Sequence, residues 1–153
     1  MKTSTLAFAF AALFLVPAAA LPADSSPAVK ADPVIEQATS ATSRKDWPRA
    51  QAVLRDGLAR DPGNADYHNL YAYSVRKGES PDMNLVFKHY NEALRLDPKH
   101  RGAHEYIGEA YLMVGNLPQA KEHLSALDKL CFFPCSEFTD LKKAIGEYEA
   151  KGK

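Results

Sequence analysis

The sequence is poor in the residues that mark several specialised classes of protein. Its 153 residues include two cysteines, eight glycines and ten prolines, too few for a disulfide-dense miniature scaffold, a collagen-like chain or a low-complexity chain. It also lacks an excess of either charge, because 19 Lys and Arg residues balance 19 Asp and Glu residues. A general nucleic-acid-binding protein carries a basic surplus, so we expect no nucleic-acid partner.

A long hydrophobic stretch is also missing near the N-terminus. The apolar run from Leu6 to Val16 has about eleven residues, against the roughly twenty that a membrane-spanning helix needs. Lys2 precedes the run and the small residues of 18–20 follow it, which is typical of a cleavable signal peptide. We expect a signal peptide over residues 1–20, a periplasmic or secreted protein, and no stable membrane insertion after cleavage. An uncleaved anchor is the alternative.

An internal repeat organises the rest of the chain. The segment Leu-Ala-Arg-Asp-Pro at 58–62 returns as Leu-Arg-Leu-Asp-Pro at 94–98, an offset of 36 residues. Periods of this size indicate stacked supersecondary units. Large side chains recur at steps of three and four, as at Tyr67, Tyr71 and Ser74, which predicts helices. The proline-rich residues 21–33 before the repeats predict a disordered linker.

Each unit is expected to contain two antiparallel helices. Gly78 and Gly115 end the first helices with a left-handed cap. Prolines 48, 81 and 118 then fall in the first turn of the second helices, where a missing N–H costs little. Three residues are candidate N-caps of these second helices: Asp46, Ser80 and Asn116.

The pattern within these units resembles the tetratricopeptide repeat. Small residues fill one slot in each first helix (Ala72, Gly108) and each second helix (Ala50, Val86, Ala120), and Asp-Pro closes a unit. The resemblance implies an all-α, right-handed superhelix of about three helical hairpins, with a domain over 34–150 and units at 31–64, 65–100 and 101–134. We expect the small slots to lie where the two helices of one unit cross.

A capping helix is predicted after the third unit. Phe138, Leu141, Ile145 and Tyr148 recur at steps of three and four within residues 136–150, and solenoids need a terminal element with one polar side. Ser136 is the expected N-cap of this helix.

The two cysteines, Cys131 and Cys135, are four positions apart, in a C-x3-C pattern that contains Pro134. On an unbroken helix their Cβ atoms would be about 5–6 Å apart, beyond disulfide reach, but Pro134 predicts a bend at Phe133. In an exported protein we expect a structural disulfide. A redox dithiol and a Cu(I) site are the alternatives, because thiolates favour soft metals.

Histidines and catalytic motifs add no further site. His68 matches His104 at an offset of 36 and His89 matches His123 at an offset of 34, so duplication explains these four residues and we expect no metal ligand among them. No nucleophile elbow, phosphate loop or dinucleotide fingerprint is present in the sequence. We therefore expect neither an enzyme nor a cofactor.

The resemblance implies that the first helices line a concave groove for a protein or peptide partner. The predicted groove residues are Asn69, Tyr73, Arg76, Lys77, Glu105, Glu109, Leu112 and Met113. The sequence thus predicts an exported protein-binding adaptor. A copper or thiol-redox accessory protein that uses Cys131 and Cys135 is the alternative, and the oligomeric state is not predicted.

Overall fold

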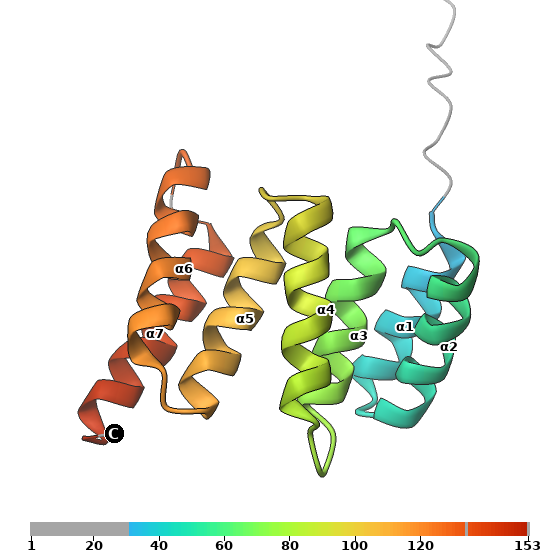
Figure 1. Cartoon of the computed structure of the whole chain (residues 1–153), viewed down its shortest axis with the longest axis horizontal. Coiled ribbons are helices and arrows are strands. Elements are labelled where there is room, and N and C mark those ends of the chain that lie inside the picture. The colour runs from blue at the N-terminus through green and yellow to red at the C-terminus, as the bar shows by residue number, and fades with distance from the viewer. Residues whose placement is uncertain (1–30, 134, 153) are drawn as a thin grey trace, which may run out of the picture. The chain divides into compact units, whose positions relative to one another are not determined.

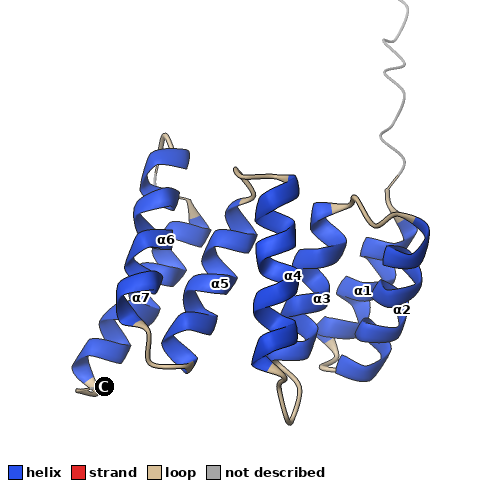
Figure 2. Ribbon diagram, viewed as in Figure 1, coloured by secondary structure: helices blue, strands red, loops and turns tan. Residues whose placement is uncertain are grey.

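Seven α-helices build the part of the chain that the structure describes. The computed structural model describes residues 31–133 and 135–152, and this part contains helices and turns without any strand (Figure 2). The helices are α1 (Pro33–Ser43), α2 (Trp47–Arg60), α3 (Ala65–Arg76), α4 (Met83–Leu96), α5 (Arg101–Met113), α6 (Leu117–Leu130) and α7 (Ser136–Ala150). The expected signal peptide and most of the expected linker lie outside the described residues.

The helices stack in series as antiparallel hairpins, which Figure 1 shows along the long axis. α1 pairs with α2, α3 with α4, and α5 with α6, while α7 packs on both α5 and α6. The odd-numbered helices contact one another from α1 to α7, whereas the even-numbered helices of the described chain contact odd-numbered helices alone. The odd helices therefore form the tighter inner layer, and the even helices form the outer layer. The expected all-α fold of serial hairpins is confirmed.

The tight turns of the first and third hairpins have the same backbone. Lys45 has a φ of 59° and Gly115 a φ of 79°, and both lie in the left-handed region that suits a helix C-terminus. In each turn the next residue donates its N–H back to the helix, from Asp46 to Ala41 and from Asn116 to Tyr111. Asp46 and Asn116 also act as the expected N-caps of α2 and α6.

The middle hairpin differs from the expectation. Ser80 is not the N-cap and Pro81 is not in the first turn, because α4 begins at Met83 and the side chain of Asp82 caps it. Gly78 does not have a positive φ. The longer connection between α3 and α4 reverses the chain over several residues, so a left-handed residue is not required there.

A continuous core runs between the two layers. Leu54, Tyr90 and Ile107 are fully buried in the part formed by α1 to α5, and Leu127 and Leu141 are fully buried in the part formed by α6 and α7. Tyr111 of α5 packs against both parts. The capping helix thus shares its apolar face with the last hairpin. No helix within residues 31–133 and 135–152 combines the length and the hydropathy needed to cross a bilayer.

The capping helix α7 packs closely on α5. The three heavy atoms nearest to a Cβ atom on Gly108 would all belong to Leu141 of α7, with Cδ2 at 2.6 Å, so the glycine admits the capping helix. The expectation that Ser136 caps α7 is wrong: Cys135 occupies the N-cap position without a side-chain bond to the helix, and Ser136 Oγ donates to Glu137 Oε2 instead.

Candidate functional site

The predicted groove residues lie on two neighbouring helices of the inner layer, α3 and α5. Three of them belong to α3 and four to α5, while Lys77 is the C-cap of α3. The structure buries three of the eight: Asn69 is 5% exposed, Arg76 6% and Glu105 8%. The expectation that these three lie on an exposed face is wrong, because the helices packed against α3 and α5 cover them.

Arg76 is the centre of a polar network inside this layer. Its Nη2 lies 2.6 Å from Glu109 Oε2 on α5, and its Nε donates to the hydroxyl of Tyr90 over 3.2 Å. Its Cζ lies 5.6 Å from the ring centre of Tyr73 and 5.7 Å from that of Tyr106, within the range of a cation–π interaction. Arg76 therefore joins α3, α4 and α5.

Glu105 lies one helical turn before Glu109 on α5 and has no comparable partner. Its carboxylate takes part in no hydrogen bond or ion pair with the described residues. Burial, as the largest cause, and the neighbouring Glu109, Asp140 and Glu137 together raise the pKa of Glu105 to about 7, against the opposing effect of Arg76. This carboxyl group changes charge near neutral pH.

Two hollows open along the junction of α5 and α7. One, of about 280 Å³, is lined by Glu105, Glu109, Asp140, Lys143, Ala144 and Glu147. The other, of about 390 Å³, is lined by Leu112, Met113, Gly115, Ala144, Glu147, Tyr148 and Lys151. The inner layer therefore has an acidic hollow next to a hollow lined by both apolar and charged side chains.

Asn69 leaves one buried polar atom without a partner among the described residues. Its Oδ1 accepts no hydrogen bond, although the side chain lies against Gly102 at the start of α5. Such an atom costs free energy unless something donates to it.

Two histidine pairs were missed by reasoning from the sequence. His68 Nδ1 lies 2.8 Å from His89 Nδ1, and His104 Nδ1 lies 2.9 Å from His123 Nδ1. The offsets show that His68 is equivalent to His104 and His89 to His123. They do not show that, within each hairpin, the histidine of the first helix contacts the histidine of the second. Equivalence combined with the hairpin geometry could have found both pairs.

The backbone fixes which nitrogen carries the proton in each pair. The carbonyl oxygen of Pro62 accepts from His68 Nε2 over 3.0 Å, so His68 Nδ1 is free to accept from His89. Pro98 serves His104 in the same way, over 3.1 Å. Burial, as the largest cause, and the partner imidazole together lower the pKa of His89 and of His123 to about 4. Both pairs are built for neutral imidazoles.

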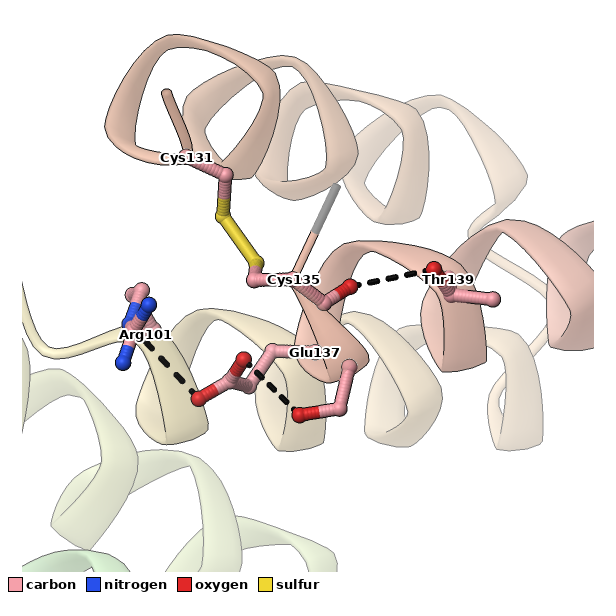
Figure 3. Close-up of a disulfide and its surroundings, with 6 residues drawn as sticks. Arg101, Cys131, Cys135, Glu137 and Thr139 are labelled. Carbon is pink, nitrogen blue, oxygen red and sulfur yellow. Dashed lines mark hydrogen bonds and ion pairs between the residues drawn. A yellow bond between two sulfur atoms is a disulfide. The ribbon is translucent and has the colours of Figure 1, made fainter. Parts of the chain in front are cut away.

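The sulfur atoms of Cys131 and Cys135 lie 2.03 Å apart, and the Cα atoms lie 5.8 Å apart. Figure 3 shows this pair between the end of α6 and the start of α7. Thr139 Oγ1 donates to the carbonyl oxygen of Cys135 over 3.0 Å. Phe132 and Phe133 in the same segment are 94% and 75% exposed. Among the described residues no group of three or more His, Cys, Asp or Glu side chains could hold a metal ion.

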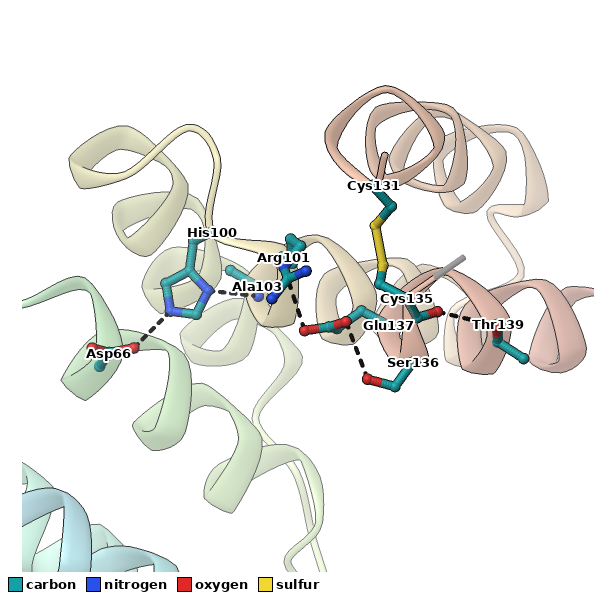
Figure 4. A network of polar contacts seen from close by, with 9 residues as sticks. All are labelled: Asp66, His100, Arg101, Ala103, Cys131, Cys135, Ser136, Glu137 and Thr139. Carbon is teal, nitrogen blue, oxygen red and sulfur yellow. Dashed lines mark hydrogen bonds and ion pairs between the residues drawn. A yellow bond between two sulfur atoms is a disulfide. The ribbon is translucent and has the colours of Figure 1, made fainter. Parts of the chain in front are cut away.

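A second polar network joins α3, α5 and α7 at the N-terminal ends of these helices (Figure 4). His100 Nδ1 accepts from the N–H of Ala103 over 3.2 Å and so caps α5, which leaves its Nε2 to donate to Asp66 over 3.1 Å. Arg101 Nε lies 3.6 Å from Glu137 Oε1 on α7. These contacts link the N-terminal ends of α3, α5 and α7.

No protein-family model and no curated protein sequence matches the chain, but solved structures do. The TPR2B domain of yeast Sti1, in a complex with pHsp70, matches with a TM-score of 0.68 at 18% identity, over 77% of this chain and 94% of that one.

A bacterial protein has a similar structure. The translocator chaperone SycD of the Yersinia enterocolitica type III secretion system matches with a TM-score of 0.67 at 15% identity, over 78% of this chain and 83% of that one. SycD in complex with a peptide of the translocator YopD matches with a TM-score of 0.64 at 15% identity, over 78% and 92%. These likenesses confirm the expected tetratricopeptide-type superhelix.

Proposed function

We propose that this protein is a non-enzymatic adaptor that binds a protein or peptide partner on its inner layer, the surface formed by α1, α3, α5 and α7. The observation that carries the proposal is the composition of this surface. Half-buried aromatic rings (Tyr73, Tyr106) and charged groups lie together on α3 and α5, and the two hollows beside α7 continue this surface. Aromatic and charged side chains on a rigid helical scaffold suit peptide recognition.

The similar structures support the same use of the fold. The Sti1 domain was solved in a complex with pHsp70, and SycD was solved with a peptide of YopD. The partner of the present chain need not resemble either, since its inner surface carries its own residues. We expect an extended or helical peptide segment as the ligand.

The proposal includes export to the periplasm or beyond. The pattern of residues 1–20 supports a signal peptide. A disulfide between Cys131 and Cys135, whose Cα atoms lie 5.8 Å apart, would persist in an oxidising compartment. The alternative, a copper or thiol-redox accessory role, needs the Cys131–Cys135 bond to open. Thiol titration of the native exported protein separates the two: stoichiometric Cu(I) uptake or ready reduction would favour the accessory role.

Capture from the exported fraction with matched variants tests the adaptor role. A Tyr73→Ser, Met113→Ser variant changes the inner layer, whereas a Lys88→Ser, Glu122→Ser variant changes exposed positions of α4 and α6. We expect the first variant to lose the partner and the second to retain it, with both as helical as the wild type by circular dichroism. Equal capture by the two variants would contradict the proposal.

A further inference from the structure

The acidic hollow between α5 and α7 has charged groups that differ in how they are paired. Four carboxylates and one ammonium group line it. Glu109 is paired with Arg76 at 2.6 Å, and Glu147 is paired with Lys143 at 3.9 Å. Within the described residues, Glu105 and Asp140 take part in no ion pair. The hollow therefore holds two carboxylates that lack a cation.

Glu105 differs from the other carboxylates of the hollow because it is largely buried and unpaired. Its side chain belongs to a residue that is 8% exposed, it lines the hollow, and it has no partner there. Its carboxylate oxygens still reach the solvent of the hollow, but the partial burial of an ionised carboxylate without a counter-charge costs free energy. A cation entering the hollow would remove that cost, and Asp140 on α7 would add a second acceptor from the opposite wall.

Arg76 shows which kind of cation this layer accommodates. One turn along α5 from Glu105, the guanidinium of Arg76 is held by the Glu109 carboxylate and lies over the rings of Tyr73 and Tyr106. A long basic side chain can hydrogen-bond to carboxylates on two helices at once. A divalent metal ion needs its ligands to converge, and no such group of three exists among residues 31–133 and 135–152.

We propose that this hollow holds a lysine or arginine side chain of the peptide partner, with the Glu105 carboxylate as its ion-pair partner and Asp140 as a second acceptor. The inference rests on the proposed function, because it names the chemistry of the segment that the inner layer binds. The volume of about 280 Å³ lies just below the range of whole small-molecule sites, so it suits one side chain. The partner segment is therefore basic at this position.

Binding should strengthen as Glu105 ionises. Burial and the neighbouring Glu109, Asp140 and Glu137 raise the pKa of this carboxyl to about 7, and Arg76 acts against them. Lys143 and Glu147 are the other charged groups of the hollow. The neutral acid predominates below that pH and the carboxylate above it. A basic side chain should accordingly bind more tightly at pH 8 than at pH 6.

NMR titration with acetyl-arginine amide tests the proposal directly, and acetyl-citrulline amide is the neutral isosteric control. At pH 8 we expect the arginine probe to shift the backbone amide signals of Glu105 and Asp140 and the citrulline probe to leave them unchanged. Glu105→Gln should weaken the arginine probe about tenfold, the effect of losing one charge-assisted hydrogen bond. Glu122→Gln, on the outer helix α6, is the matched control and should not weaken it.

Three results would overturn the inference: equal shifts with both probes, undiminished arginine binding by a folded Glu105→Gln variant, or shifts at Glu105 and Asp140 with calcium chloride in place of arginine. The titration uses no natural partner, so it can fail while capture succeeds, or succeed while capture fails. Failure of this subsite is thereby distinguished from failure of the adaptor role.

Discussion

Gly108 of α5 lies directly against Leu141 of α7, and a Cβ atom on the glycine would come within 2.6 Å of Leu141 Cδ2. This contact lets the capping helix cover the last hairpin. It also makes the junction that forms both hollows sensitive to the size of a single residue.

Gly108→Ala should therefore destabilise the protein even though alanine favours helix formation. Overpacking a fully buried site costs about 1–3 kcal/mol. Gly146→Ala, on the exposed face of α7 with nothing within 4 Å of its Cβ position, is the matched control and should stabilise by about 0.5–1 kcal/mol. Urea unfolding measures both, and a stabilising effect at Gly108 would show that Leu141 moves away easily.

The turn at Lys45 offers a stabilising substitution. Lys45 has a φ of 59° in the turn where the third hairpin has Gly115, and a side chain in the left-handed region costs about 1–2 kcal/mol. Lys45→Gly should raise the free energy of unfolding by about 0.5–1 kcal/mol after the greater entropy of the unfolded glycine chain is allowed for. Lys77→Gly is the control, because Lys77 has an ordinary φ of −86°, and it should destabilise. If Lys45→Gly lowered the free energy of unfolding, the inference that the left-handed backbone of Lys45 is strained would be contradicted.

The histidine pairs should make stability depend on pH. Burial and the partner imidazole lower the pKa of His89 to about 4, below its ordinary value of 6.5, so the unfolded chain binds more protons between these values. The stability is complete above pH 6.5 and is lost as the pH falls toward 4.

The ring of His89 lies 4.6 Å from that of Tyr71, measured between centroids. A His89→Phe variant removes the pH-dependent contribution and keeps an aromatic ring against Tyr71. It also removes one hydrogen bond, so it should destabilise by about 1 kcal/mol at pH 7.5 and by less, or not at all, at pH 4.5. Thermal unfolding at the two pH values gives the difference between variant and wild type. A difference that does not change with pH would rule out neutral pairing of His68 with His89.

Removing both cysteines should weaken the cap without abolishing binding. A disulfide between Cys131 and Cys135 would close a very short loop, so its stabilisation by chain entropy would be about 2 kcal/mol at most. The Cys131→Ser, Cys135→Ser variant should have a lower Tm than the oxidised protein and should match the reduced wild type. Loss of partner capture by this variant while it remains folded would favour the thiol-based alternative.

Local signals in the sequence predicted much of the fold. The apolar steps of three and four and the caps at Asp46 and Asn116 act within one helix or one turn, and the 36-residue offset relates one hairpin to the next. The structure has the hairpins that these signals predict. The prediction for the longer connection after α3 was wrong in detail. Ser80 and Pro81 have the sequence pattern of a helix start, but Asp82 is the N-cap of α4.

The sequence alone did not predict contacts between distant segments. The spacing of Gly108 does not reveal Leu141, which is on a helix outside the repeat pattern. Arg76 and Glu109 looked like free groove charges, yet they form an ion pair because α3 and α5 are neighbours. Glu105 is buried for the same reason, since α7 covers that part of α5. A sequence indicates which face of a helix is polar, but the neighbouring helices decide how much of it stays exposed.

Site-specific photo-crosslinking tests the central claim most directly. A photoreactive phenylalanine analogue would replace Tyr73 or Leu112 on the inner layer, or Lys88 or Glu122 on the outer helices, in protein exported by its own cells. We predict that the two inner positions crosslink to the same partner, on a segment that contains a lysine or arginine, and that the two outer positions do not. Crosslinks to that partner from the outer positions alone would contradict binding on the inner layer.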